Sequence, residues 1–173
     1  MSYDLTLFRL PEGADADAAY HALMEQEEAD AGDFDGRLTR SIPDSSRQEM
    51  QQLAGELKGQ HPAFVQFETT SPLPHIELND EQLQVQVIIY ERTVAITVPY
   101  FRKHASSMMA CIKRCIEVLN SVAGFVAYDP QLGRIVTTAD IDDMVKQYRQ
   151  MDSALPVILA HNRADKKPWW KFW

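Results

Sequence analysis

Two short runs of alternating apolar residues decide the fold: Leu83-Gln-Val-Gln-Val-Ile-Ile-Tyr-Glu91 and Thr93-Val-Ala-Ile-Thr-Val98. Successive side chains of a β-strand point to opposite faces, so each run places one apolar face against a core. Because the connection between the runs is short, they predict an antiparallel hairpin. Pro99 has no backbone N–H to donate, and it places the end of the second strand at about Tyr100.

After this hairpin the apolar period changes to three and four residues, which predicts a long amphipathic helix over residues 103–123. Its apolar positions are Met108, Met109, Ile112, Cys115, Ile116, Leu119, Val122 and Ala123. Gly124 is suited to a left-handed helix end, so we expect the chain to re-enter the sheet as a second hairpin over residues 124–136. The turn of that hairpin holds three typical turn residues, Asp129, Pro130 and Gly133.

The remaining segments show the same two periods. They predict strands over residues 2–10, 63–67 and 76–79, and helices over residues 14–31, 44–58 and 139–153. The full order is β-α-α-β-β-β-β-α-β-β-α, in which hairpins dominate over βαβ units. This order predicts an α+β fold, with a mainly antiparallel sheet and helices packed on it.

With 173 residues, the chain is long enough to form one core without disulfides or a structural metal. We expect a single α+β domain over residues 1–160 and a basic, aromatic C-terminal tail over residues 161–173. The chain has no run of about 18 apolar residues and does not begin with a basic segment followed by an apolar one. These features predict no membrane partner and favour a cytoplasmic protein.

The two cysteines, Cys111 and Cys115, are four residues apart on the long predicted helix. Two thiols without a nearby His or further Cys make a poor zinc site. We therefore expect both to be reduced core residues, as is usual in the cytosol. Neither a metal site nor a cofactor motif is indicated by the sequence.

The charge is distributed unevenly along the chain, whose net charge is −8. Residues 1–60 hold 13 acidic and 5 basic side chains, whereas residues 161–173 hold 1 acidic and 4 basic ones. Binding to nucleic acid requires a positive surface that faces the phosphates. The acidic N-terminal part therefore argues against a nucleic-acid partner.

An acidic segment from Glu12 to Asp35 holds nine acidic residues and neither Lys nor Arg. It can be a solvated helix face that continues into an acidic loop, or a patch that attracts a basic protein. As candidate partner-binding residues it offers Glu25, Glu27, Glu28, Asp30, Asp33 and Asp35.

The C-terminal tail holds all three tryptophans of the chain, Trp169, Trp170 and Trp173, interleaved with lysines. These aromatics can fold back onto an apolar face of their own domain, or they can anchor a partner or a second copy of the chain. Membrane and single-stranded nucleic-acid contacts are disfavoured because the tail is short and the rest of the chain is acidic.

Catalytic motifs for nucleotide binding, zinc hydrolysis and serine hydrolysis do not occur in the sequence. The five histidines are scattered, and His61 and His75 beside prolines are expected to be exposed. Asp129 and Arg134 face each other across the second hairpin. They can serve a small hydrolase or transferase site together with a loop histidine, or simply form a turn-stabilising Asp and a surface ion pair. The second interpretation predicts that the chain is not an enzyme.

Three segments together resemble small bacterial proteins, some of which are regarded as immunity proteins for polymorphic or contact-delivered toxins. These segments are Ser2-Tyr-Asp-Leu5, Val94-Ala-Ile-Thr-Val-Pro-Tyr100 and Ala127-Tyr-Asp-Pro-Gln-Leu-Gly-Arg134. The resemblance covers residues 83–136 and the first strand, and it implies no specific binding residues. It implies a non-catalytic protein-binding module that neutralises a toxin by occlusion. The alternatives are a structural homo-oligomer that uses the tail, and the hydrolase or transferase described above.

Overall fold

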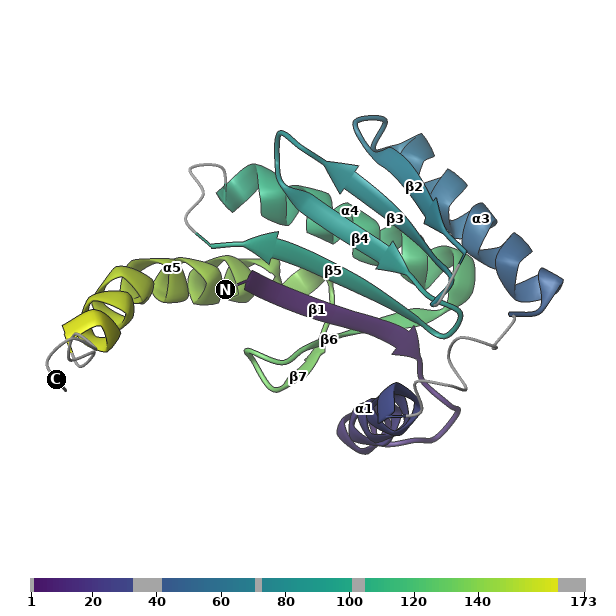
Figure 1. Ribbon diagram of the computed structural model, residues 1–173, viewed down its shortest axis with the longest axis horizontal. Helices are drawn as coiled ribbons and strands as arrows, with labels where there is room; N and C mark the ends of the chain where they lie inside the picture. The colour runs from purple at the N-terminus through teal and green to yellow at the C-terminus, as the bar shows by residue number, and fades with distance from the viewer. Residues whose placement is uncertain (1, 33–41, 71–72, 101–104, 165–173) are drawn as a thin grey trace, which may run out of the picture.

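The computed structural model describes residues 2–32, 42–70, 73–100 and 105–164. Over these residues it contains one antiparallel sheet of seven strands in the order β2-β3-β4-β5-β1-β6-β7 (Figure 1). The strands are β1 (Ser2–Arg9), β2 (Val65–Thr69), β3 (His75–Asp80), β4 (Val85–Ile89), β5 (Thr93–Pro99), β6 (Phe125–Asp129) and β7 (Arg134–Val136). The helices are α1 (Ala16–Gly32), α3 (Asp44–Gln60), α4 (Ala105–Ala123) and α5 (Ile141–Ala164), with a short 3-10 turn η1 (Thr138–Asp140). The predicted α+β class and order of elements are confirmed.

The first strand of the chain lies in the middle of the sheet. β1 pairs with β5 over Ser2–Phe8 and with β6 over Thr6–Arg9, both antiparallel. It therefore joins the β2–β5 meander to the β6–β7 hairpin. The predicted β4–β5 hairpin is present, with Val87 opposite Ile96 and Ile89 opposite Val94.

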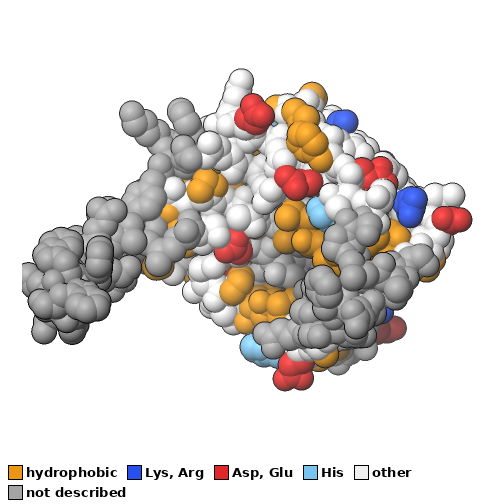
Figure 2. Space-filling model, viewed as in Figure 1, with side chains coloured by type: hydrophobic (Ala, Val, Ile, Leu, Met, Phe, Trp, Pro, Cys, Tyr) orange, Lys and Arg blue, Asp and Glu red, His pale blue; other side chains and the backbone are white. Residues whose placement is uncertain are grey.

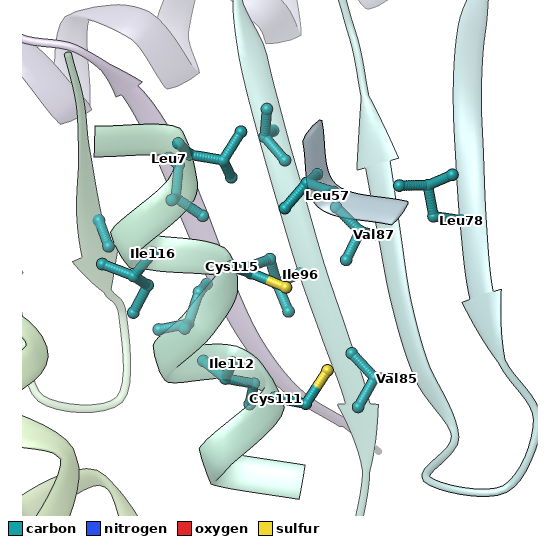
Figure 3. Packing of buried hydrophobic residues seen from close by; sticks show 14 of the residues in the cluster. Leu7, Leu57, Leu78, Val85, Val87, Ile96, Cys111, Ile112, Cys115 and Ile116 are labelled. Atoms are coloured by element: carbon teal, nitrogen blue, oxygen red, sulfur yellow. The ribbon is translucent and has the colours of Figure 1, made fainter. Parts of the chain in front are cut away.

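The core lies between one face of the sheet and the helices α3 and α4. The alternate residues Leu7, Val87 and Ile96 point from the strands toward this layer (Figure 3). They and Leu5 are almost completely buried. From the other side, α4 contributes Met108, Met109, Ile112 and Leu119, all fully buried, and α3 contributes Leu57. Cys111 and Cys115 are buried and unoxidised within this layer, as predicted.

Several element boundaries differ from the prediction by one or two residues, and the end of α5 differs by more. β2 begins at Val65 instead of residue 63, because Phe64 enters the core and its N–H bonds to the carbonyl of His61 in a turn. α5 continues to Ala164, beyond the expected end at Ser153, and runs through Pro156. Pro156 has no backbone N–H, so the helix continues through it with one backbone hydrogen bond fewer.

The entrance to α5 is fixed by the side chains that follow β7. Thr137 caps η1: its side chain accepts from the N–H of Ala139, and its own N–H donates to Asp140 at 2.8 Å. Arg134 donates to the same carboxylate at 2.7 Å. The N–H and side-chain bonds of Thr137 and the bond from Arg134 lower the pKa of Asp140 to about 2. The negative charge is therefore present at the start of the helix at neutral pH.

Candidate partner-binding surface

The second face of the sheet is free of described helices over β2 to β5, so Figure 1 looks directly onto its strands with α4 behind them. The strand registers place one side chain from every strand in a single row across this face. The row consists of Phe67, Glu77, Ile88, Ala95, Thr6, Tyr128 and Ile135. We call the outward side of the seven strands the open face.

Large apolar side chains reach solvent at one end of the open face. Val65 and Phe67 on β2 are 50% and 54% exposed, and Ile88 on β4 is partly exposed. Figure 2, in the same view, shows hydrophobic side chains interspersed with acidic ones over these strands. A monomer gains nothing from leaving two such side chains half in water, whereas a partner that covers them gains apolar burial.

The charge of the open face is negative. Its strand positions include the acids Asp4 and Glu77, and none of its outward strand positions is a Lys or Arg. Hydrogen bonds from the side chains of Asn79 and Gln86 hold the pKa of Glu77 below its usual range, although partial burial opposes them. Glu77 is therefore ionised at neutral pH, between the apolar Phe67 and Ile88.

The acidic helix α1 lies at the other end of the same face. Tyr20 of α1 stacks on Tyr128 of β6 with ring centroids 3.8 Å apart and planes at 15°, and it also contacts Phe8. Burial raises the pKa of Tyr128, and the negative charge of Asp17 contributes to that rise. The fold thus places the acidic segment and the open face side by side, which the sequence did not show.

Tyr20 attaches α1 to the sheet through its rings on Phe8 and Tyr128, and none of the described side chains of this helix is fully buried. We expect Tyr20→Ala to loosen α1 while the sheet stays folded, with a loss of about 0.5–1.5 kcal/mol for the ring pair. Limited proteolysis should then cut α1 roughly tenfold faster, with a melting temperature within a few degrees of the wild type. Gln26→Ala, at an exposed position of the same helix, is the control; equal cleavage of both variants would show that the stack does not hold α1.

The predicted partner-binding residues fall into three groups. Glu25 is exposed on α1. Glu27, Glu28 and Asp30 lie on the same helix, but their side chains are outside the described part of the structure. Asp33, Asp35, Trp169, Trp170 and Trp173 lie outside the described residues. The sequence-based prediction missed the residues of the open face, although alternation in β2 to β5 already separated them from the core positions.

Asp129 and Arg134 do not form the predicted surface ion pair. Asp129 is completely buried: it accepts hydrogen bonds from the N–H groups of Gln131 and Leu132 and from the hydroxyl of Tyr3. Arg134 donates instead to Asp140. The prediction of a turn-stabilising Asp129 is confirmed. The prediction of a surface ion pair is wrong because the carboxylate of Asp129 points inward to these three donors.

The prediction of an exposed His61 is also wrong. Its Nε2 lies 2.6 Å from Oδ2 of Asp80, and the two side chains are only 20% and 3% exposed. Burial alone would raise the pKa of Asp80, but hydrogen bonds from the N–H of Leu83, from His61 and from the N–H of Gln82 lower it. The pair therefore ties the end of α3 to the β3–β4 turn and has a structural role. His75 is partly exposed, and its Nδ1 lies 2.8 Å from the carbonyl oxygen of Leu73.

A cavity of about 240 Å³ lies on the other side of the molecule, between α4 and the β6–β7 hairpin. Its walls are mainly apolar and include Ile116, Phe125 and Val136, and the Asn120 amide at its side donates to the carbonyl of Phe125 at 3.0 Å. Neither Asp129 nor Arg134 lines this cavity. The residues of the suggested hydrolase or transferase site are therefore not gathered around it.

The described residues contain no group of three or more His, Cys, Asp or Glu side chains arranged to hold a metal ion. Within the same part of the chain, every helix is too short or too polar to cross a membrane.

Comparisons with protein-family models, with curated proteins and with solved structures found no match to this chain. The resemblance to immunity proteins therefore stays a prediction.

Proposed function

We propose that this chain is a non-catalytic protein-binding module that captures a basic protein on the open face and α1. The observation that carries the proposal is the half-exposed pair Val65 and Phe67 on a face whose charged strand residues are acids. Apolar side chains supply binding energy once water is excluded, and the surrounding negative charge selects and attracts a basic surface. An acidic helix beside this face extends the attraction.

A more specific form of the proposal is a cytoplasmic bacterial immunity protein that neutralises its toxin by occlusion. It is supported by the resemblance of residues 83–136 to such proteins and by the acidic character of the surface. Toxins that act on nucleic acid carry basic surfaces, which an acidic module would cover. An immunity gene ordinarily lies beside its toxin gene, so the C-terminal domain of the protein encoded by the neighbouring reading frame is the partner to test.

Charge reversal on α1 tests the electrostatic part of this proposal. With Glu25, Glu27 and Glu28 all changed to Lys, we expect the association rate constant for that domain to fall about tenfold at low salt. The dissociation rate constant should change much less, and the difference from the wild type should shrink as salt is added. Stopped-flow or surface-binding kinetics measure both constants.

The matched control is a variant with Glu56, Glu81 and Glu117 changed to Lys. These exposed acids lie on α3, on the β3–β4 turn and on α4, and the variant changes the net charge by the same amount. It should associate several times faster than the α1 variant. Equal rates for the two variants would mean that net charge alone acts, and the placement of α1 would have no role.

A further inference from the structure

The outermost strand β2 has features of a contact between two copies of this chain. Over the described residues it pairs on one side only, with β3, so its other edge offers unpaired backbone N–H and C=O groups. α3 packs on β3 and β4, and its Gln51 and Lys58 reach the side chains of Glu68 and Gln66 on the inner side of β2. We propose that β2 pairs antiparallel with β2 of a second copy, about a two-fold axis at Phe67.

The register follows from the side chains of the strand. With Phe67 opposite its own copy, the two rings meet on the open face, and Val65 lies opposite Thr69 of the second copy. On the inner side, Gln66 lies opposite Glu68. A register centred on Glu68 would set two carboxylates directly against each other, which is unfavourable. A register centred on Gln66 would place Glu68 opposite the apolar Phe64. The Phe67-centred register is therefore the self-complementary one.

Charge complementarity identifies the occupant as a second copy. Lys58 of α3 extends over the edge strand, with its Nζ 3.4 Å from the amide oxygen of Gln66. Because Gln66 faces Glu68 of the second copy, each Lys58 comes within reach of a carboxylate across the axis, and the two-fold axis makes two such pairs. Glu68 is exposed and accepts from Gln51 at 2.7 Å, so it is already held on the inner side of β2.

The contact consists of one five-residue strand and the side chains around it, which is at the small end of specific interfaces. We therefore expect a dimer that dissociates in the micromolar range. Pairing at β2 leaves β3, β4, β5 and α1 free but covers Val65 and Phe67, so the dimer and the basic partner proposed above compete for these two side chains. Sedimentation of the chain alone tests the dimer without that partner.

Mixing of two charge variants of the full chain tests the pairing. Lys58→Glu alone creates two carboxylate pairs across the axis, and Glu68→Lys alone creates two ammonium pairs. We expect each to weaken self-association about tenfold. An equimolar mixture should associate as strongly as the wild type, since every contact then joins opposite charges. Sedimentation velocity over a concentration series measures this. A monomeric wild type up to about 1 mM, or variants that self-associate like the wild type, would overturn the proposal.

A cysteine scan tests the register directly. Opposed Cα atoms of an antiparallel pair are about 4.5–5.5 Å apart, within the range of a disulfide. Phe67→Cys should therefore oxidise to a covalent dimer, whereas Val65→Cys and Val122→Cys, which do not face their own copies, should not. Val122 is a suitable control because it is 40% exposed on α4. Equal cross-linking of all three variants, or none at Phe67→Cys, would contradict the two-fold pairing.

Discussion

Asp129→Ala is expected to lower the free energy of unfolding by about 3–5 kcal/mol, enough to leave a small domain partly unfolded at 37 °C. The carboxylate is completely buried and accepts from the N–H groups of Gln131 and Leu132 and from the hydroxyl of Tyr3. Alanine would leave these three donors without an acceptor inside the protein. Urea unfolding followed by circular dichroism measures the loss.

Two milder variants separate the contributions to this network. Tyr3→Phe removes one donor and keeps the turn, so we expect a loss of about 1–2 kcal/mol. Asp129→Asn keeps one acceptor oxygen for the turn. Its loss of unfolding free energy should therefore lie between the losses for Tyr3→Phe and Asp129→Ala. A loss below about 1 kcal/mol for Asp129→Ala would show that water replaces the carboxylate, and that the side chain does not hold β1 to the β6–β7 hairpin.

Thr97→Arg is expected to weaken binding of the basic partner at least about 30-fold. Thr97 lies on β5 in the middle of the open face, in the register row that joins Gln86 to Asp4, and it is partly exposed. A long cationic side chain at this position both separates the two surfaces and repels a basic partner. Isothermal titration calorimetry against the neighbouring-gene domain measures the dissociation constant.

Gln52→Arg is the control for this substitution, because it adds the same charge at an exposed position of α3. We expect it to change the dissociation constant less than threefold, and both variants should melt within a few degrees of the wild type. If both variants raised the dissociation constant equally, the partner would bind away from Thr97, or the interaction would depend on net charge alone.

Local periodicity was sufficient to predict the strands and most of the core of α4. Met108, Met109, Ile112, Cys115, Ile116 and Leu119 are all buried, as the helical spacing predicted. Val122, assigned to the same stripe, is 40% exposed, whereas Cys111 and Val118 are buried. The buried surface of α4 is wider than a narrow stripe because α3 and α5 pack against this helix in addition to the sheet.

Contacts between distant segments could not be predicted from patterns. The place of β1 between β5 and β6 depends on which edges the two hairpins leave open, and alternation within β1 carries no information about that. The pairing of His61 with Asp80 requires the end of α3 to meet the β3–β4 turn. Similarly, the acidic helix reaches the open face through the stack of Tyr20 on Tyr128, two rings that are far apart in the sequence.

The candidate surface was predictable only in part. The acidic character of α1 could be read from the sequence, and Glu25 is exposed as a partner-binding residue requires. The open face was not predictable, because it exists only where no described helix covers the outward side of β2 to β5. Whether a helix packs there cannot be seen in the pattern of a single strand. An alternating strand has a second face whether or not another layer covers it.

Methyl NMR of the wild-type chain, titrated with the neighbouring-gene domain, tests the proposed surface most directly. The open face carries methyl groups of Val65, Ile88 and Ala95, and Val122 on α4 provides a reference on the other side of the molecule. If the open face binds the partner, the signals of Val65, Ile88 and Ala95 should shift or broaden while that of Val122 stays unchanged. Perturbation of Val122 with unmoved signals from the three strand residues would contradict the proposed surface.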